Sequence, residues 1–212
     1  MPNLKITIVS SQNSWLNKHI QGFIDELKGC QVIWVHEVQE IGEGNIAFFL
    51  GFEEIVNKEA LDKHKNNLVV HESDLPKGKG MSPMTWQILE GKNEISITLF
   101  EMEEKLDSGN VYLQDIMGFN GLELVSEIRD KQAEYTFNLC KKFLDSYPEI
   151  LGSGKVQEGA ESFYKGRNPE DSQLDFNKTI AEQFNLLRVV DNDKYPAFFE
   201  HQGEKYFLKI TK

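Results

Sequence analysis

The chain has 212 residues, 40% of them hydrophobic, which is enough for one main domain with a sizeable core. Its formal net charge of -11 disfavours nucleic acid as a partner, because a phosphate backbone would meet net repulsion. No signal peptide or membrane-length apolar run is recognised, and Cys30 and Cys140 match no metal or redox spacing. We therefore expect a cytoplasmic protein with reduced thiols and no membrane partner.

The first third of the chain alternates between predicted strands and helices. Strands are expected at residues 4–11, 31–38, 45–52 and 67–71, and helices at 15–29 and 57–66, the second capped by Asn57. The strands read as continuous apolar runs, as parallel strands buried on both faces do. This pattern predicts an α/β domain with a mostly parallel sheet flanked by helices.

The remainder of the chain adds further helices and strands, and the expected elements become shorter beyond Pro148. We expect a helix at 82–92, strands at 94–102 and 110–119, and a long helix from about 122 to 147 that ends at Pro148. Beyond it come a flexible stretch, a helix at 179–190 and a hairpin about Gln202 and Gly203. The expected organisation is a catalytic domain at residues 1–148 and a docked helix-and-hairpin extension at 149–212.

The extension carries apolar side chains of uncertain use. Phe198, Phe199 and Tyr206 either pack the extension against the main domain or form the contact of a homodimer.

Candidate catalytic groups follow two strands. His71 ends the strand at 67–71, and Asp107 lies in the loop after the strand at 94–102. Ligands in open parallel sheets bind beyond the carboxyl ends of the strands, and we expect these two groups to meet above adjacent strand ends. An Asp beside a His fixes its tautomer and raises its basicity, which general acid–base chemistry requires.

The segments "GFEEIVNKEAL" and "NLVVHESDLPKGKGMSPMTWQILEGKNEISITLFEMEEKLDSGNVY" resemble the catalytic domain of the formyltransferases that use 10-formyltetrahydrofolate. That family's pattern is Asn-x-His-x-Ser-x-Leu-Pro, a basic residue and Gly, and a distal Asp-x-Gly. The residues that match it in order are His71, Ser73, Leu75, Pro76, Lys79, Gly80, Asp107 and Gly109. The resemblance is strong over residues 45 to 115 and weaker in the tail.

The resemblance implies a Rossmann-like formyltransferase fold with 10-formyltetrahydrofolate as formyl donor and no metal. His71 would stabilise the developing oxyanion, and Asp107 would orient His71 and help to remove the amine proton. The pterin would lie between the backbone of Glu54 and Val56 and the loop of Met102, Glu103 and Glu104, with Met81 at the entrance.

One position departs from the family pattern. Its asparagine, two residues before the histidine, is Val69 here. Loss of one oxyanion donor can cost about 100-fold or more in rate. Protonated His71, or a backbone N–H near Gly80, is expected to carry more of the charge, and Asn67 is a weaker substitute.

The amine that accepts the formyl group is expected to belong to a nucleotide-linked 4-amino-4,6-dideoxy sugar, as in the bacterial surface-glycan enzymes of the pseudaminic acid type that the chain resembles. The cations expected to hold its diphosphate are Lys77, Lys79, Arg167 and Arg188. Two alternatives remain open. One is formylation of an aminoacyl or peptidyl amine, and the other is a folate or nucleotide-sugar binding module without turnover.

Overall fold

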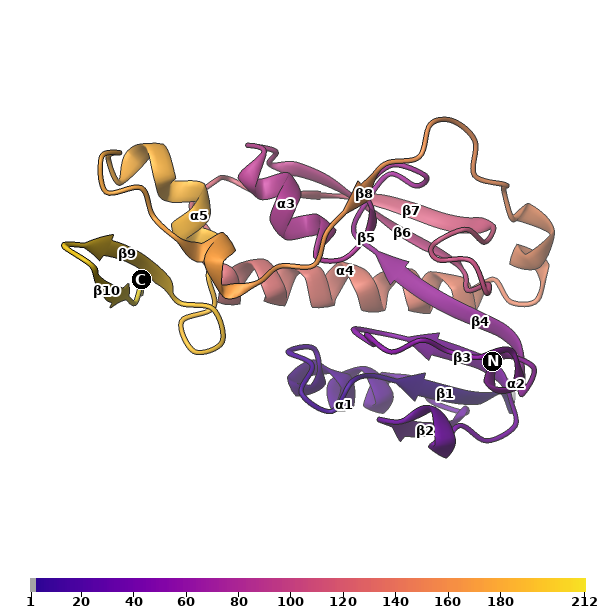
Figure 1. The fold of residues 1–212 in the computed structure, drawn as a ribbon. Coiled ribbons are helices and arrows are strands. Elements are labelled where there is room, and N and C mark those ends of the chain that lie inside the picture. The colour runs from indigo at the N-terminus through magenta and orange to yellow at the C-terminus, as the bar shows by residue number, and fades with distance from the viewer. Residues whose placement is uncertain (1–2) are drawn as a thin grey trace.

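The computed structural model describes residues 3–212, which form a six-stranded sheet with helices on both faces (Figure 1). The strand order is β2-β1-β3-β4-β6-β7, with β1, β2, β3 and β4 parallel and β6 and β7 antiparallel to their neighbours. The strands are β1 (Lys5–Val9), β2 (Gln31–Val35), β3 (Gly44–Phe49), β4 (His64–His71), β6 (Glu94–Glu101) and β7 (Val111–Gly118). The predicted α/β fold with a mostly parallel sheet is confirmed.

Two apolar layers cover the two faces of this sheet. The larger core includes Ile20 of α1 (Asn17–Glu26), Ile88 of α3 (Pro83–Leu89) and Phe143 of α4 (Val125–Asp145), packed on Phe48 and Leu68. The opposite face carries a smaller cluster under η1 (Val38–Glu40) and α2 (Lys58–Leu61). Because side chains alternate along β4, Leu68 faces the larger core and Val69 the smaller one.

The helix predicted at residues 57–66 is much shorter in the structure. Asn57 does cap α2, accepting a hydrogen bond from the Ala60 N–H, but the helix ends at Leu61. Strand β4 already begins at His64, which pairs with Gly44 of β3. Sheet pairing therefore overrides the weak local helical pattern, and β4 is three residues longer than expected.

The C-terminal extension runs back along the main domain before it forms its own small core. Its elements are η2 (Glu149–Ser153), β8 (Phe163–Tyr164), η3 (Pro169–Ser172), η4 (Ala181–Gln183), α5 (Phe184–Val189), β9 (Ala197–His201) and β10 (Glu204–Leu208). Strand β8 pairs with β5 (Lys79–Gly80), far from it in sequence. The distal core is built on Leu174, Leu187, Val190 and Ala197.

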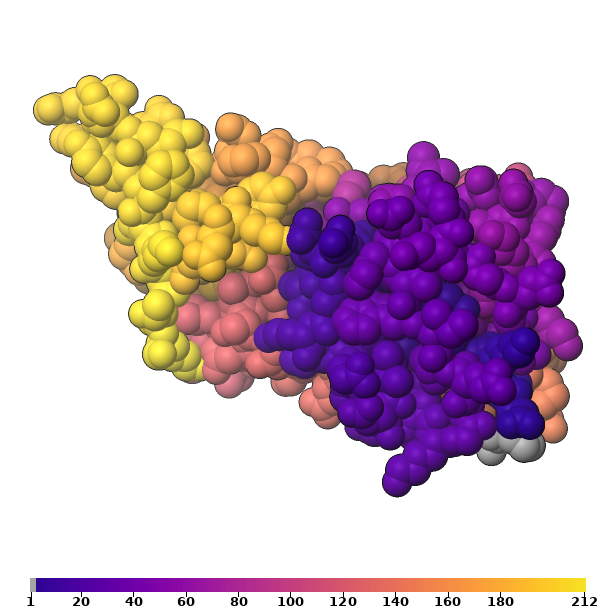
Figure 2. All heavy atoms as spheres, turned by 90° about the horizontal axis from the view of Figure 1, so that it is seen from below, coloured from indigo at the N-terminus to yellow at the C-terminus, as the bar shows by residue number. Residues whose placement is uncertain are grey.

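The β9–β10 hairpin lies at the end of the molecule away from the N-terminal strands, and Figure 2 shows the C-terminal residues projecting there. Phe198 is buried, in line with the alternative in which it packs the extension, whereas Tyr206 is about half exposed. No helix within residues 3–212 is both long enough and apolar enough to cross a membrane.

Candidate active site

His71 is the last residue of β4, and its ring is buried on the face of the sheet that carries Val69. Its Nε2 lies 2.8 Å from the carbonyl oxygen of Gly78. Because a carbonyl oxygen only accepts hydrogen bonds, Nε2 carries the hydrogen in this arrangement. The recorded hydrogen bonds of residues 3–212 leave Nδ1 unused, so one ring nitrogen is held and the other is available.

Asp107 lies beside this ring. Its Oδ2 is 3.9 Å from Nε2 of His71 and accepts a 2.9 Å hydrogen bond from the Gly80 N–H. The two groups do not meet above adjacent strand ends, as was expected. Strand β6 is antiparallel to β4 and ends opposite Leu68, three residues short of His71. Asp107 instead reaches the histidine from a loop that returns to the sheet, where its own φ is 47°.

The Asp107 loop is fixed from the C-terminal extension. The side-chain amide of Gln157 donates to the carbonyl oxygens of Asp107, at 3.0 Å, and of Gly109, at 2.9 Å. A Cβ at Gly109 would collide with the carbonyl oxygen of Glu101, so only glycine fits there. The distal Gly of the Asp-x-Gly pattern is thus explained by close backbone approach.

The loop that follows His71 is also held by the extension, through β8. Gly78 N–H donates to Oγ of Ser162 at 2.9 Å, and the backbone N–H of Lys79 donates to the Ser162 carbonyl. The ammonium of Lys79 is 1% exposed and lies 2.7 Å from Glu161, which also accepts from Lys105. These two lysines hold the pKa of Glu161 below its ordinary value. Sequence reasoning missed β8 because a two-residue strand leaves no periodic signal.

The two segments expected to hold the pterin meet on the same face as His71. Val56 lies in the smaller apolar cluster, against which Phe52, Val69 and Met102 pack. The recorded hydrogen bonds of the described chain include none from the backbone of residues 54–56. Free backbone groups beside an apolar surface fit a flat heteroaromatic ring.

The acidic side chains of these segments point to solvent. Glu54, Glu103 and Glu104 are exposed, so a ligand would meet their backbone more readily than their carboxylates. Met81 is about half exposed and its sulfur faces Gly166 of the extension.

Neither Asn67 nor the Gly80 N–H, two of the substitutes expected from the sequence, is free to replace the family asparagine at Val69. The Asn67 amide donates to the carbonyl oxygen of Leu61 at 3.0 Å and therefore braces α2. The Gly80 N–H is already bound to Asp107. Of the donors expected from the sequence, His71 alone remains free to act on an oxyanion.

A cleft of about 290 Å³, the inner cleft, opens on the other side of the end of β4. Ser14, Gly51 and Glu72 line it from the ends of β1, β3 and β4, and Gln132 of α4 and Arg167 of the extension complete it. Oε1 of Glu72 accepts a 2.5 Å hydrogen bond from Gln132. Burial raises the pKa of the Glu72 carboxyl, although the charge of His71 and the bond from Gln132 act in the opposite direction.

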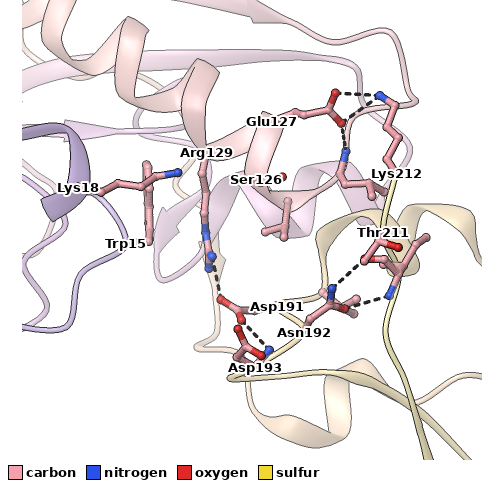
Figure 3. Close-up of a pocket in the computed structure, with 14 residues that line it drawn as sticks. Trp15, Lys18, Ser126, Glu127, Arg129, Asp191, Asn192, Asp193, Thr211 and Lys212 are labelled. Carbon is pink, nitrogen blue, oxygen red and sulfur yellow. Dashed lines mark hydrogen bonds and ion pairs between the residues drawn. The ribbon is translucent and has the colours of Figure 1, made fainter.

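A larger cleft of about 760 Å³, the outer cleft, adjoins the inner one, and both are lined by Trp15, Arg129 and Asp191. Figure 3 shows Arg129 reaching Asp191, where Nη1 and Oδ2 are 2.7 Å apart. The cleft also holds Lys18 and Lys212. These cations come from α1, α4 and the chain's last residue, so no local motif announces them.

The four cations expected to bind a diphosphate are not gathered in one place. Arg167 lines the inner cleft, where it donates to Asp171 and Ser172, and Lys77 is exposed on its loop. Arg188 is 1% exposed and donates to Glu123 and to Asn93. Like Lys79, it is buried at an internal ion pair, so neither residue presents its charge to a phosphate at the surface.

Among the described residues, no group of three or more His, Cys, Asp or Glu side chains is arranged to hold a metal ion.

Comparison with known sequences finds similarity to one family in the central part of the chain. Residues 34–136 match the family model described as formyl transferase. A curated methionyl-tRNA formyltransferase of Mycoplasma capricolum is 29% identical over 143 residues, which is 67% of this chain and 45% of that protein. The match thus spans less than half the length of the curated relatives.

Solved structures share the fold across almost the whole chain. The methionyl-tRNA formyltransferase of Clostridium thermocellum superposes with a TM-score of 0.79 at 20% identity, over 98% of this chain and 92% of that one. A sugar N-formyltransferase from Shewanella gives 0.71 at 16% identity, over 98% and 97%. HypX from Aquifex aeolicus, solved with tetrahydrofolic acid, gives 0.82 at 16% identity, over 98% and 37%. Residues 34–136 are thus similar to the formyl transferase family, and almost the whole chain shares the fold of these solved structures.

Proposed function

We propose that the protein transfers the formyl group of 10-formyltetrahydrofolate to the amine of a nucleotide-linked 4-amino-4,6-dideoxy sugar. The observation that carries formyl transfer is the buried His71–Asp107 pair at the end of β4, with 3.9 Å between Nε2 and Oδ2. The apolar face formed by Val56, Met102 and Val69 supports a folate on the same side.

The chain's own residues supply the acid–base steps. Gly78 holds Nε2–H of His71, so the neutral ring presents Nδ1 as the nitrogen that accepts a proton from the attacking amine. Asp107 stabilises the imidazolium that results, whose Nδ1–H hydrogen-bonds the oxygen that gains negative charge. This proton would then pass to the donor nitrogen as its bond to the formyl carbon breaks. The folate supplies the one-carbon unit, and the protein supplies position and electrostatics.

The amino-sugar acceptor rests on the resemblance to surface-glycan enzymes and is supported by sugar N-formyltransferases among the structures that share the fold. The two adjoining clefts provide room for an extended substrate, with the reacting end in the inner cleft and the remainder in the outer one.

Cytoplasmic location and a homodimer belong to the same proposal. The half-exposed Tyr206 and the exposed Phe207 of the hairpin are available for a contact between two copies.

The test is a mass-spectrometric assay of the purified protein with 10-formyltetrahydrofolate and a panel of UDP- and dTDP-linked 4-amino-4,6-dideoxy sugars. The expected product gains one formyl group. Asp107→Asn should lower its rate about 100-fold, whereas Asp62→Asn, at an exposed position on the surface, serves as the matched control. Absence of product from every panel member would reject the sugar acceptor.

Methionyl-tRNA is the second candidate, because the curated relatives are methionyl-tRNA formyltransferases. The same assay run with charged initiator tRNA separates the two, since formylmethionine appears only if this acceptor is used. Folate binding without transfer to any acceptor would identify a binding module instead.

A further inference from the structure

The end of β4 separates two differently built sides. His71 points to the face that carries Val69 and the predicted folate segments, where the smaller apolar cluster lies. Glu72, the next residue, lines the inner cleft with Ile88 and Ile128, which belong to the larger core on the other face. A donor bound on the first side and an acceptor bound on the second would therefore meet at the end of one strand.

Glu72 is held in this cleft by two glutamines. Its side chain accepts from Gln132 of α4 at 2.5 Å, and its carbonyl oxygen accepts from Gln87 of α3 at 2.7 Å. The carboxylate has a second oxygen, Oε2, that none of the recorded hydrogen bonds within residues 3–212 employs. The group is thus oriented through one oxygen and retains acceptor capacity on the other.

The cations of the inner cleft do not neutralise Glu72. Arg129 is paired with Asp191, Arg167 donates to Asp171 and Ser172, and Lys194 donates to the carbonyl oxygen of Asn13. No ion pair recorded within residues 3–212 includes Glu72. Glu72 is half-buried, and a carboxylate that is partly removed from water gains from a charge-assisted partner, which can be a ligand cation.

We propose that Glu72 binds the protonated amino group of the acceptor, positions its nitrogen beside His71 and accepts the proton that this nitrogen loses before it attacks. This inference rests on the proposed formyl transfer and adds to it the residue that distinguishes an amine from a hydroxyl. The position of Glu72 next to His71 in the chain explains why the amine would arrive at the catalytic ring. The electrostatics agree, since burial raises the pKa of the Glu72 carboxyl, the charge of His71 lowers that pKa and the charge of Asp107 raises it.

The experiment compares two probes by calorimetry in the presence of 5-formyltetrahydrofolate, an analogue of the donor that carries its formyl group on a different nitrogen. One probe is dTDP-4-amino-4,6-dideoxyglucose, and the other is dTDP-6-deoxyglucose, which has a hydroxyl in place of the amine. The wild-type protein should bind the amine at least about 10-fold more tightly, as expected for a charge-assisted hydrogen bond. Glu72→Gln should reduce this ratio to about 1.

Glu53→Gln is the matched control, because Glu53 lines the same cleft and loses the same charge. It should retain the wild-type ratio. A purely structural role for Glu72 would weaken both probes equally, so a ratio unchanged in Glu72→Gln would overturn the inference, as would a wild-type ratio near 1 or failure of both probes to bind.

The outcome also separates this inference from the proposed function. A ratio of 10 or more that Glu72→Gln abolishes, in a protein that makes no formylated product, would support the amine site and reject formyl transfer to this sugar. Formylated product with a ratio near 1 would support transfer and reject the role of Glu72.

Discussion

The two sides of the end of β4 are assembled in different ways. On the side of His71, the reacting groups lie within a segment of the chain that has a recognisable pattern, and short loops bring them together. On the side of Glu72, the cleft combines strand ends with α3, α4 and the extension, so its residues come from across the sequence. A local pattern can therefore reveal the chemistry of the first side, while the second appears only when the chain is folded.

Replacement of His71 should have the largest effect on this comparison. His71→Ala removes the one nitrogen that can act as acid and base, and we expect kcat to fall by about 1,000-fold with the fold retained. His201→Ala, on the projecting hairpin, is the control and should leave the rate unchanged. Circular dichroism and kcat measured together decide the matter, and a variant within 10-fold of wild type would remove His71 from the mechanism.

Gly80 links the chemistry of the first side to the extension. A Cβ there would collide with the carbonyl oxygen of Tyr164, and its φ of 95° disfavours any other residue. Gly80→Ala should therefore separate β5 from β8, release the N–H held by Asp107 and lower kcat by about 10- to 100-fold. Gly91→Ala shares a positive φ but has open space, so it should cost only about 1 kcal/mol of stability and no activity. Equal activity losses in both variants would refute the linkage.

A substitution at Val69 tests whether the side of His71 lacks a hydrogen-bond donor for the oxyanion. Val69→Asn places an amide two residues before His71, and we expect kcat to rise by about 10-fold because an oxyanion donor is added. Val70→Asn is the control, since Val70 faces the opposite, larger core and should lose stability without gaining rate. An unchanged rate in Val69→Asn would mean that His71 already supplies the required stabilisation.

Replacement of Glu72, on the second side, should have the smallest effect, a change in how stability depends on pH. Burial raises its pKa, so the folded state binds this proton more readily than the unfolded state does. Its stabilising contribution is complete below the ordinary value of about 4.5 and is lost as the pH rises through the raised pKa. Glu72→Gln should then be more stable than wild type at pH 8 and equal to it near pH 4.

The measurement is Tm at both pH values, where each kcal/mol gained corresponds to about 2–4 °C in a chain of this size. The charged neighbours that face Glu72, namely His71 and Asp107, are the same in both proteins. A less stable variant at pH 8 would show that the carboxylate holds the fold together, contrary to its proposed role.

Much of the fold was accessible from the sequence because apolar runs and helical stripes carry periodic signals. The strand ending at His71, the long helix near Val125 and the hairpin at Gln202 were all expected, and each is present. The start of β4 and the whole of β8 were not, because pairing with a distant strand decides them. The burial of Arg188 was not expected for the same reason, since only the folded chain brings Glu123 and Asn93 to it.

The pairing of β5 with β8 also orders events during protein synthesis. The catalytic loop at residues 78–80 leaves the ribosome long before Ser162 and Tyr164, which give it its shape. A nascent chain or a fragment that stops at residue 148 contains His71 and Asp107 but lacks the strand and the Gln157 amide that set their geometry. Catalytic competence would thus require that translation has passed residue 164.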